Sequence, residues 1–570
     1  MSDTSDYERD RQATIARNRE LLAQLGLSDA ASVIKPTDDP KTKAKPVQPR
    51  AKKPKEAPLP TRQSTRLRRG AIDPNESPAA KRKRERAEEE QRRRGEEERR
   101  EAEERERAAK RPRHHELDLD ALADVASPEE LSDLKSIFQT VLKTPRPRKK
   151  AAEDAFVFED HKAEKAEVEE LQEKMSKLKV VARAKVTQDR VYSAAYHPEP
   201  TKDLIFFGDK HGQLGIWDAR APVDEVTDDD DERPTDDREG GKYYRLQMHW
   251  PATSKSSISC IKFDPIDAFT VYTSSYDCTV RSLSLVSGIS SEIFATDDVL
   301  ITSVDLPPQG QEMWISDAMG GITQMDLRAS RSYAKRYNIG THKIGNVSIN
   351  PTHPYFLVTA SNNRDLTVWD TRMLIDLDGT APSAPANESP RKGKAKAVDV
   401  VTFPKEVEAE AITELLDAPS GLSVKRARWS HNKAVSAAYW DPRGRSIVST
   451  SYDDTLRLWE YKPSQLVKEE PFPSARPFSQ IQHNCQTGKW LTILRAQWSP
   501  NPDVYPHFTI GNMNHSVDVY SCKGDHIATL ADKSKITAVQ AVTCSHPSVV
   551  ERIATGNGSG RCVLWAPDHS

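Results

Sequence analysis

The stretch VSAAYWDPRGRSIVSTSYDDTLRLWE, residues 435–460, is the part of this sequence that decides its fold. It holds three short apolar segments: the first runs into an Asp-Pro turn, the second is rich in small residues, and the third ends in Trp459-Glu460 after an Asp-Asp hairpin. Apolar segments this short, bounded by Asp, Gly and Pro, are typical of antiparallel β-strands joined by tight turns. The stretch therefore predicts one small β-sheet.

Six further copies of this unit lie between residues 191 and 565. The third segments of the seven copies end at Trp217, Leu283, Met325, Trp369, Trp459, Tyr520 and Trp565. The shortest spacings between these positions are 42 to 45 residues, which is the period of the WD repeat. We therefore predict an all-β fold in which residues 179–570 form a seven-bladed WD-repeat β-propeller, a ring whose closure removes free sheet edges.

The repeats also predict how the ring closes and where its insertions lie. The last copy ends after its third strand, and the alternating segment KVVARAKV, residues 179–186, precedes the first copy. We expect this segment to supply the outer strand of the seventh blade, the alternative being a simple linker. Insertions at 221–241, 373–430 and 462–480 each follow a third strand, so we expect them to crowd one face and leave the other open.

Residues 1–178 have the composition of a charged arm. The whole chain is 30% charged, has 38 prolines and a mean hydropathy of −0.72, and its net charge of −2 is a cancellation between unlike regions. Polar segments of this kind cannot bury enough apolar surface to offset the entropy of ordering, so we expect a long, largely disordered basic arm. Helical patterns predict short helices within it, at about 9–26, 81–113, 128–142 and 159–178.

Cysteine usage and motif content limit the classes of function. The six cysteines form no CxxC pair, and no apolar run reaches the ~18 residues that span a bilayer, so we expect a soluble protein in a reduced intracellular setting. The sequence has no glycine-rich phosphate loop, no HExxH motif and no Cys/His group with metal-ligand spacing. We therefore expect no enzyme activity, no cofactor and no metal.

The open face of the predicted propeller would combine cations with aromatic rings. Such a surface suits nucleic acid, because cations contact phosphates while rings stack on exposed bases. The hairpins and the loops leading into the first strands give these candidates for DNA contact: Lys210, His211, Tyr276, Arg364, Lys433, Tyr452, Lys489, Trp490, Arg495, His515 and Lys535. The loop residues His342, Lys343 and His431 would share this face. The alternative is that hairpin tips are polar in every propeller.

The arm carries several clusters of positive charge. A flexible basic segment gains affinity for nucleic acid through counterion release without reading its sequence, and the same clusters resemble nuclear-import signals. The candidates for phosphate contact or nuclear import are Lys52, Lys53, Arg62, Arg66, Arg68, Arg69, Lys81, Arg82, Lys83, Arg84, Arg148, Lys149 and Lys150. The alternative is that these charges keep a disordered arm soluble.

Two repeats end in a WDxR motif, WDAR at 217–220 and WDTR at 369–372, and MDLR at 325–328 is a degenerate copy. We expect Arg220 and Arg372 to project from the face that carries the insertions, where an acidic partner could reach them.

Several stretches together resemble one family of proteins. They include ARNRELLAQLGL and TRQSTRLRRG in the arm, LIFFGDKHGQLGIWDA in the first blade, and HNCQTGKWLTILRAQWSPNPD followed by GNMNHSVDVY near the end. These stretches resemble the fungal DNA damage-binding WD-repeat proteins of the changed-mutation-rate family, which are related to vertebrate WD-repeat protein 76. The resemblance covers the whole predicted propeller and two parts of the arm.

The resemblance implies a nuclear protein that binds single- and double-stranded DNA, prefers ultraviolet-damaged DNA and acts in DNA metabolism and the damage response. It also implies association with chromatin and, in relatives, an adaptor role in cullin-based ubiquitin ligases, whose damage-binding adaptor would bind Arg220 and Arg372. Our leading hypothesis is therefore a DNA-binding propeller. The alternative is a protein-interaction scaffold, either a substrate receptor of a cullin-RING ubiquitin ligase or a chromatin adaptor that binds histones. The two are compatible because they use opposite faces.

Overall fold

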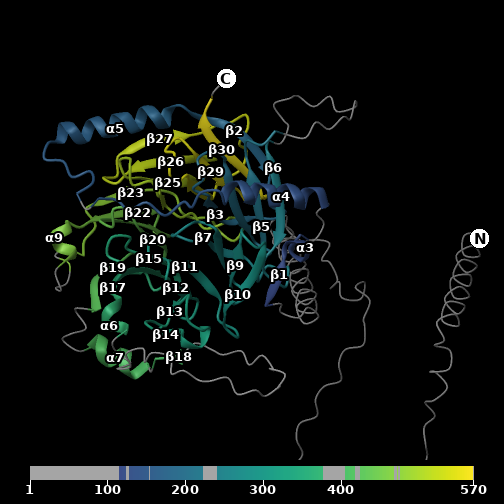
Figure 1. Ribbon diagram of the computed structural model, residues 1–570. Coiled ribbons are helices and arrows are strands. Elements are labelled where there is room, and N and C mark those ends of the chain that lie inside the picture. The colour runs from purple at the N-terminus through teal and green to yellow at the C-terminus, as the bar shows by residue number, and fades with distance from the viewer. Residues whose placement is uncertain are drawn as a thin grey trace, which may run out of the picture. The chain divides into compact units, whose positions relative to one another are not determined.

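A computed structural model of the chain describes residues 115–123, 128–152, 154–222, 240–375, 405–407, 409–417, 424–467, 472 and 475–568. Within these residues the chain forms seven mainly antiparallel sheets arranged as the blades of one β-propeller (Figure 1). The predicted fold class is thus confirmed. The basic clusters between Lys52 and Arg84 and the predicted helices at 9–26 and 81–113 lie outside the described residues.

Each blade has four strands that follow one another from the centre of the ring outward. Blade 1 consists of β3 (Val191–Tyr196), β4 (Leu204–Asp209), β5 (Gln213–Asp218) and β6 (Lys242–Gln247). Blade 2 consists of β7 (Ile258–Phe263), β8 (Thr270–Ser275), β9 (Thr279–Ser284) and β10 (Ile289–Ala295). Blade 3 consists of β11 (Ile301–Asp305), β12 (Glu312–Asp317), β13 (Gly321–Asp326) and β14 (Lys335–Asn338). Blade 4 consists of β15 (Ile344–Ile349), β16 (Phe356–Ser361), β17 (Asp365–Asp370) and β19 (Lys425–Ser430). Blade 5 consists of β20 (Val435–Trp440), β21 (Ser446–Ser451), β22 (Thr455–Glu460) and β23 (Ser479–Gln482). Blade 6 consists of β24 (Gln497–Trp498), β25 (His507–Asn512), β26 (Ser516–Ser521) and β27 (His526–Leu530).

Blade 7 closes the ring as the sequence predicts. Its inner three strands are β28 (Val542–Ser545), β29 (Ile553–Gly556) and β30 (Arg561–Pro567), and its outer strand is β2 (Leu178–Lys185) from the start of the propeller. β2 pairs antiparallel with β30, with Val180 opposite Trp565 and Lys185 opposite Arg561. Because the two ends of the ring share one sheet, neither end leaves an unpaired edge.

The strands inside the ring are buried on both faces. Every residue of β4 and β5 is buried, although the two strands carry the polar residues Asp209, Gln213 and Asp218 beside their apolar ones. Neighbouring blades cover both sides of each sheet, so the outward-facing polar positions of a one-sided sheet do not exist here. Trp217, Trp459 and Trp565, which end third strands, are fully buried between blades.

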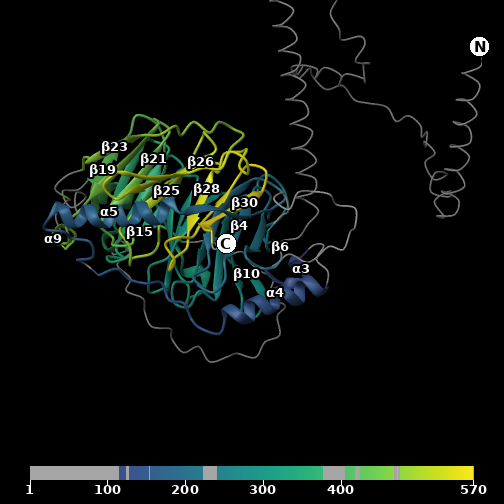
Figure 2. The same cartoon turned by 90° about the horizontal axis from the view of Figure 1, so that it is seen from above.

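The segment before β2 is folded onto the propeller, which corrects the prediction of a disordered arm extending to residue 178. β1 (Glu116–Asp118) adds a fifth strand to blade 2 by pairing with β10, and α3 (Leu119–Leu122) follows it directly. α4 (Pro128–Val141) and α5 (His161–Ser176) lie on the outside of the blades in both views (Figures 1 and 2).

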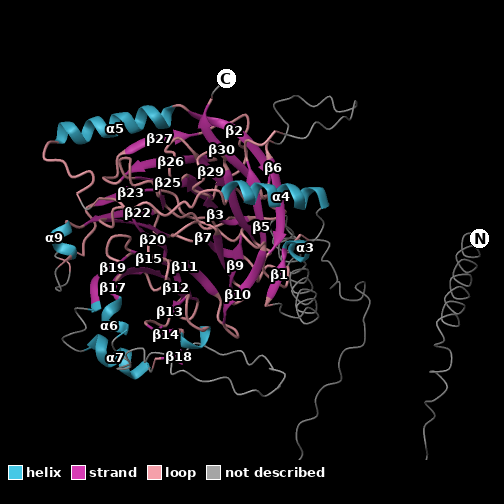
Figure 3. Cartoon of the chain, in the orientation of Figure 1, coloured by secondary structure: helices cyan, strands magenta, loops and turns pink. Residues whose placement is uncertain are grey.

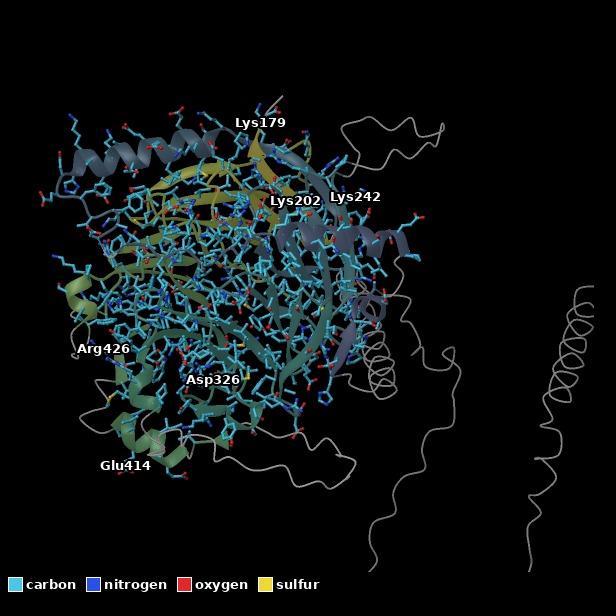
Figure 4. The ribbon with its side chains drawn as sticks, in the orientation of Figure 1. Lys179, Lys202, Lys242, Asp326, Glu414 and Arg426 are labelled. Atoms are coloured by element: carbon cyan, nitrogen blue, oxygen red, sulfur yellow. The ribbon has the colours of Figure 1, made fainter. Side chains whose placement is uncertain are left out.

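Apolar contacts explain why these two helices dock. α4 buries Leu134 and Phe138 in the same cluster as Leu246 of blade 1 and Leu285 of blade 2. Lys242, labelled in Figure 4, adds an ion pair of 3.2 Å to Asp133 of α4. α5 lies along β27 and buries Leu171 and Met175 in the cluster that contains Ile527 and Leu530. A short amphipathic helix gains its stability from such packing rather than from its own propensity.

The insertion predicted at 373–430 is shorter than expected. Residues 425–430 are β19, the outer strand of blade 4, and α6 (Thr371–Ile375) and α7 (Ala409–Asp417) lie in the excursion before it (Figure 3). The excursion also contains β18 (Lys405–Glu406), which pairs parallel with β14 of blade 3. The insertion at 462–480 holds α9 (Pro463–Leu466) and ends inside β23. Among the described residues, no helix is both long and apolar enough to cross a membrane.

Candidate nucleic-acid interface

One face of the propeller, here called the open face, carries the hairpins between second and third strands and the loops leading into the first strands. Backbone hydrogen bonds join these two kinds of loop within each of blades 1 to 5. The amide of Tyr276 donates to the carbonyl of Ser257 at 3.1 Å, and the amide of Tyr452 donates to that of Ala434 at 3.0 Å. The opposite face, here called the insertion face, carries the turns between first and second strands and the connections that leave third strands.

A segment of residues 483–496, here called the crossing segment, lies on the open face and contacts several blades. It connects β23 of blade 5 with β24 of blade 6 but reaches much further. The side-chain amide of Gln486 donates to the Tyr452 carbonyl in blade 5, whereas Thr492 Oγ1 donates to the carbonyl of Val191 in blade 1. Blades 5 and 1 lie three positions apart in a ring of seven, and between them the segment also passes beside blade 7, where a β-carbon at Gly558 would lie 3.9 Å from the carbonyl oxygen of Trp490.

The crossing segment presents Lys489 and Trp490 to solvent. Arg190 Nη1 donates to the Lys489 carbonyl at 3.2 Å, which fixes the backbone at this point against the start of blade 1. The Trp490 side chain is 70% exposed, and it is the only tryptophan among the large apolar side chains exposed in the described part of the chain. A large ring normally gains by burial, so an exposed tryptophan held on a fixed backbone is a candidate for stacking on a ligand.

Tyr276 lies beside two cations. Lys343 Nζ donates to the Tyr276 hydroxyl at 3.0 Å and lies 4.8 Å from the centre of its ring. Burial would raise the pKa of Tyr276, but the positive charges of Lys343 and Arg495 outweigh it and lower that pKa. The open face is therefore electrically positive at this point, as a phosphate-binding surface requires.

The structure does not place every candidate on the exposed surface. Tyr452 is half-buried, and burial raises its pKa. Arg495, at the end of the crossing segment, lines a cavity in the central channel. His431 is buried inside blade 5, where it contacts Ser449 at 3.1 Å and Asp453 at 3.4 Å, and burial lowers its pKa to about 4. The expectation that His431 lies on the open face was wrong, because the ring packs under the hairpin beside Trp459.

The remaining candidates surround the crossing segment on separate blades. Arg364, Lys433 and His515 are exposed on blades 4, 5 and 6. Lys210 and Lys535, of blades 1 and 7, are half-buried, and the Lys535 carbonyl accepts from Arg183 Nη1 at 3.0 Å. His211 is half-buried and its Nδ1 lies 2.7 Å from an Asp189 carboxylate oxygen. The cations are thus spread over blades 1, 4, 5, 6 and 7 rather than gathered in one compact patch.

Comparison with known proteins agrees with this fold. The family described as WD domain, G-beta repeat matches residues 243–282 and 424–460. The protein named DNA damage-binding protein CMR1 of Cryptococcus neoformans is 36% identical over the full length of both chains. Proteins of the same name from Mycosarcoma maydis and Neurospora crassa are 31% and 32% identical, over 100% and 98% of each chain. This chain belongs to the CMR1 family.

In this CMR1-family chain the basic residues Arg148 and Lys149 are held against the propeller. The linker between α4 and α5 runs along the insertion face, where the amides of Arg146 and Arg148 donate to the carbonyls of Asp267 and Pro265 at 3.0 and 2.8 Å. Arg146 also forms an ion pair of 3.1 Å with the buried carboxylate of Glu199. Lys149 pairs with Asp503 of blade 6. Lys150 is exposed.

The WDxR arginines of this CMR1-family chain lie on the insertion face, each beside an internal carboxylate. Arg220 Nε lies 2.6 Å from the fully buried carboxylate of Asp203. Arg372 contacts both oxygens of Asp370, at 2.9 and 2.7 Å, and its guanidinium lies 4.0 Å from the centre of the Tyr355 ring. Both side chains keep exposed surface, 33% for Arg220 and 50% for Arg372.

Arg328 of the degenerate copy forms an ion pair of 2.9 Å with Asp326, which is labelled in the lower half of the propeller in Figure 4. Arg328 and Arg372 thus pair with the aspartate of their own motif, whereas Arg220 pairs with Asp203, outside its motif.

Proposed function

We propose that this CMR1-family protein is a nuclear DNA-binding protein of the damage response, which binds single- and double-stranded DNA and prefers ultraviolet-damaged DNA. Relatives that match it over their full length are named for binding damaged DNA. The observation in its own structure that supports this most is the exposed ring of Trp490 beside the exposed Lys489, on a face that carries cations on several blades.

The physical basis of a damage preference is base stacking. Stacking of one base on an aromatic side chain contributes about 1–3 kcal/mol, but in an intact duplex the base must first leave its own stack. A lesion that weakens pairing lowers this cost. Trp490 would supply the ring, while Lys489, Arg364, Lys433, His515 and the Lys343–Tyr276 pair would surround the phosphates. Binding of this kind reads distortion rather than sequence.

A matched pair of variants tests this proposal. Trp490→Ala should weaken binding to single-stranded and ultraviolet-damaged DNA about tenfold, with a smaller effect on intact duplex, since one stacking contact is lost. Tyr333→Ala is the control, because Tyr333 is 74% exposed, lies in η3 (Arg331–Tyr333) after a third strand, and so belongs to the insertion face. Fluorescence anisotropy across a salt series measures both. Equal affinity of Trp490→Ala and wild type for damaged DNA would refute the role of this face.

A protein-interaction scaffold is the second candidate function, as a substrate receptor of a cullin-RING ligase or as a chromatin adaptor that binds histones. The partly exposed arginines Arg220 and Arg372, on the face opposite the DNA site, support it. Arg372→Ala removes one exposed guanidinium and should reduce recovery of the ligase adaptor in a pull-down. Arg328→Ala, in the degenerate copy, serves as the comparison. If the protein with Arg220→Ala and Arg372→Ala combined recovers as much adaptor as wild type, the two WDxR arginines do not bind the adaptor.

A further inference from the structure

The loops that lead into blades 2, 5 and 6 each supply a buried histidine, and the three are His249, His431 and His483. The amide of His249 donates to the carbonyl of Gly212, in the hairpin of blade 1, at 3.1 Å. The ring of His249 lies 2.9 Å from the hydroxyl of Thr273 and 3.0 Å from a carboxylate oxygen of Asp277, both in blade 2. The imidazole therefore fills a space near the open face and gives two polar groups of the blade a hydrogen-bond partner.

Blade 4 has the same framework with a glycine in place of the histidine. The carbonyl oxygen of His249 packs so closely on Gly212 that a β-carbon there would lie 2.6 Å from it. The carbonyl oxygen of Gly340 packs in the same way on Gly320, in the hairpin of blade 3. Gly340 thus has the backbone position of His249 in its own repeat. A β-carbon added at Gly340 would meet no atom of the described residues within 4 Å, so the space of the ring is open.

A cavity of about 140 Å³, here called the blade 4 slot, occupies this space. Thr359 and Asn363 line it at the positions that Thr273 and Asp277 have in blade 2. Trp369 also lines it, is only 4% exposed, and donates from its indole nitrogen to Thr359 Oγ1 at 2.9 Å. This hydrogen bond fixes the indole ring, so the slot has a rigid aromatic wall.

The charged groups of the blade 4 slot are mostly positive. Two cations line it, Lys425 and Arg428, against one carboxylate, Asp365. Arg428 Nη2 donates to Asp365 at 2.7 Å, yet its side chain is 58% exposed at the rim of the slot. Burial and then the charge of Arg428 lower the pKa of Lys425, as expected where positive charges outnumber negative ones. The slot therefore favours a ligand that carries negative charge.

The volume of the slot suits one flat six-membered ring. An engineered cavity of about 150 Å³ in another protein holds a single benzene molecule. The two fused rings of a purine are larger than this, whereas a pyrimidine has the right size. The amide of Asn363, which has both a donor and an acceptor, can pair with the polar edge of such a ring. The positive rim favours a ring attached to phosphates over the imidazole of a partner protein.

We propose that the blade 4 slot receives one unpaired pyrimidine base of DNA, turned out of its strand, with the adjoining phosphate near the exposed Arg428. This inference rests on the proposed function and deepens it, because it names the part of the DNA that enters the protein. Turning a base out of its stack costs least where pairing is already lost. The slot thus adds a preference for unpaired pyrimidines to the sequence-independent binding of the open face.

Duplexes that contain one unpaired thymine or one unpaired adenine test the slot, by fluorescence anisotropy with the full chain. Wild type should bind the thymine duplex about fivefold more tightly, because only the pyrimidine enters. Gly340→His places an imidazole in the slot, so it should bind both duplexes as wild type binds the adenine duplex. Thr341→His is the matched control: it adds the same ring to the same loop at an exposed residue outside the slot lining, and should keep the preference.

Two results would overturn the proposal: equal affinities of wild type for the thymine and adenine duplexes, or the same preference in wild type and Gly340→His. Because the imidazole fills a cavity, Gly340→His should unfold at or above the temperature of wild type, so a loss of preference would not come from unfolding.

The indole N–H resonance of Trp369 reports on the slot in wild type without any DNA. With nitrogen-15-labelled tryptophan, thymidine 5′-monophosphate should shift this resonance saturably and deoxyadenosine 5′-monophosphate should not; Trp369→Phe assigns it. A shift with imidazole but not with thymidine 5′-monophosphate would mean that the slot takes a histidine of a partner protein, and would refute the proposal. A chain that binds no DNA but shows the thymidine shift would instead contradict the proposed function alone.

Discussion

Lys343 and Tyr276 meet on the open face across the width of a whole blade. Lys343 leads into blade 4 and Tyr276 is in the hairpin of blade 2, yet Nζ donates to the phenol oxygen at 3.0 Å. The pair therefore joins blades 2 and 4 over the loops of blade 3. It also concentrates positive charge, because the ammonium lies 4.8 Å from the centre of the ring that it contacts.

The ionisation of Tyr276 should depend on Lys343. The cations Lys343 and Arg495 lower the pKa of Tyr276 against the effect of burial, so removing one of them leaves burial less opposed. We expect Lys343→Ala to raise this pKa. Carbon-13 chemical shifts of labelled tyrosine across an alkaline titration measure it, and Tyr276→Phe assigns the resonance. An unchanged pKa in Lys343→Ala would show that the two side chains do not interact in solution.

The same shift predicts a change of stability at alkaline pH. Because the folded pKa of Tyr276 lies below its unfolded value of about 10, the folded state loses its proton first as the pH rises. Ionised Tyr276 and Lys343 then stabilise the folded state increasingly as the pH rises above the folded pKa of Tyr276. This contribution to stability disappears as the pH falls back through that pKa. Urea unfolding of wild type and Tyr276→Phe between pH 7 and 10 should therefore diverge towards the alkaline end.

Acid should destabilise the propeller through its buried histidines. Burial lowers the pKa of His431 and His546 to about 4, whereas in the unfolded chain a histidine takes up its proton near pH 6.5. Between these values the unfolded state binds more protons, so stability present above pH 6.5 is lost as the pH falls towards 4. Each of these residues contributes roughly 1–3 kcal/mol to that loss. A constant free energy of unfolding from pH 7 to 5 would contradict this account.

The sequence predicts the seven blades of the propeller more accurately than it predicts the helices that dock on the outside of the blades. Turn residues and third-strand tryptophans recur with a fixed order, so seven blades and the closing strand β2 follow from spacing alone. Docking of α4 and α5 does not follow, because it depends on a few apolar residues such as Phe138 and Met175 finding a surface that only the folded ring provides. β19 falls inside the predicted insertion 373–430, because a strand that follows a long excursion does not lie at the usual distance in the sequence from the third strand of its blade.

The sequence likewise predicts only part of the candidate nucleic-acid interface. Hairpin positions place Arg364 and His515 correctly on the open face, but spacing cannot distinguish an exposed loop cation from one that turns inward. Arg495 and His431 differ from Lys489 and Lys433 only in the direction of the side chain. The sequence does contain one usable signal for His431: Ser449 and Asp453 follow it at the positions where blade 2 has Thr273 and Asp277 after His249.

Blade 4 lacks this histidine, and a cavity of about 140 Å³ lies where its ring would be. Gly340 occupies the corresponding position, and a β-carbon added there would meet no atom within 4 Å. Thr359 and Asn363, the equivalents of Ser449 and Asp453, line the cavity with Trp369. Gly340→His should therefore stabilise the protein by about 1 kcal/mol, through burial of the ring and one hydrogen bond.

Chemical unfolding measures this gain, and Gly340→Ala is the matched control because it restricts the backbone without supplying the imidazole. If alanine stabilises the protein as much as histidine does, the gain comes from the unfolded chain and the cavity plays no part.

Arg364, which lies on the open face, should lower the free energy of unfolding because its backbone conformation is left-handed. The same position of all seven hairpins has positive φ, at Gly212, Cys278, Gly320, Arg364, Asp454, His515 and Gly560. This left-handed conformation costs an L-residue other than glycine roughly 1 kcal/mol. Arg364 adopts it with φ of 81° although glycine would avoid the cost, and strained residues of this kind gather at functional sites.

Arg364→Gly should therefore raise the free energy of unfolding by roughly 0.5–1 kcal/mol while lowering DNA affinity two- to threefold, since one peripheral cation is lost. Arg364→Lys keeps both the strain and the charge, so it should match wild type in both measurements. Urea unfolding and anisotropy in the same buffer give the two values. A glycine variant that gains stability and binds DNA as tightly as wild type would show that the arginine is tolerated at this hairpin for some other reason than contact with DNA.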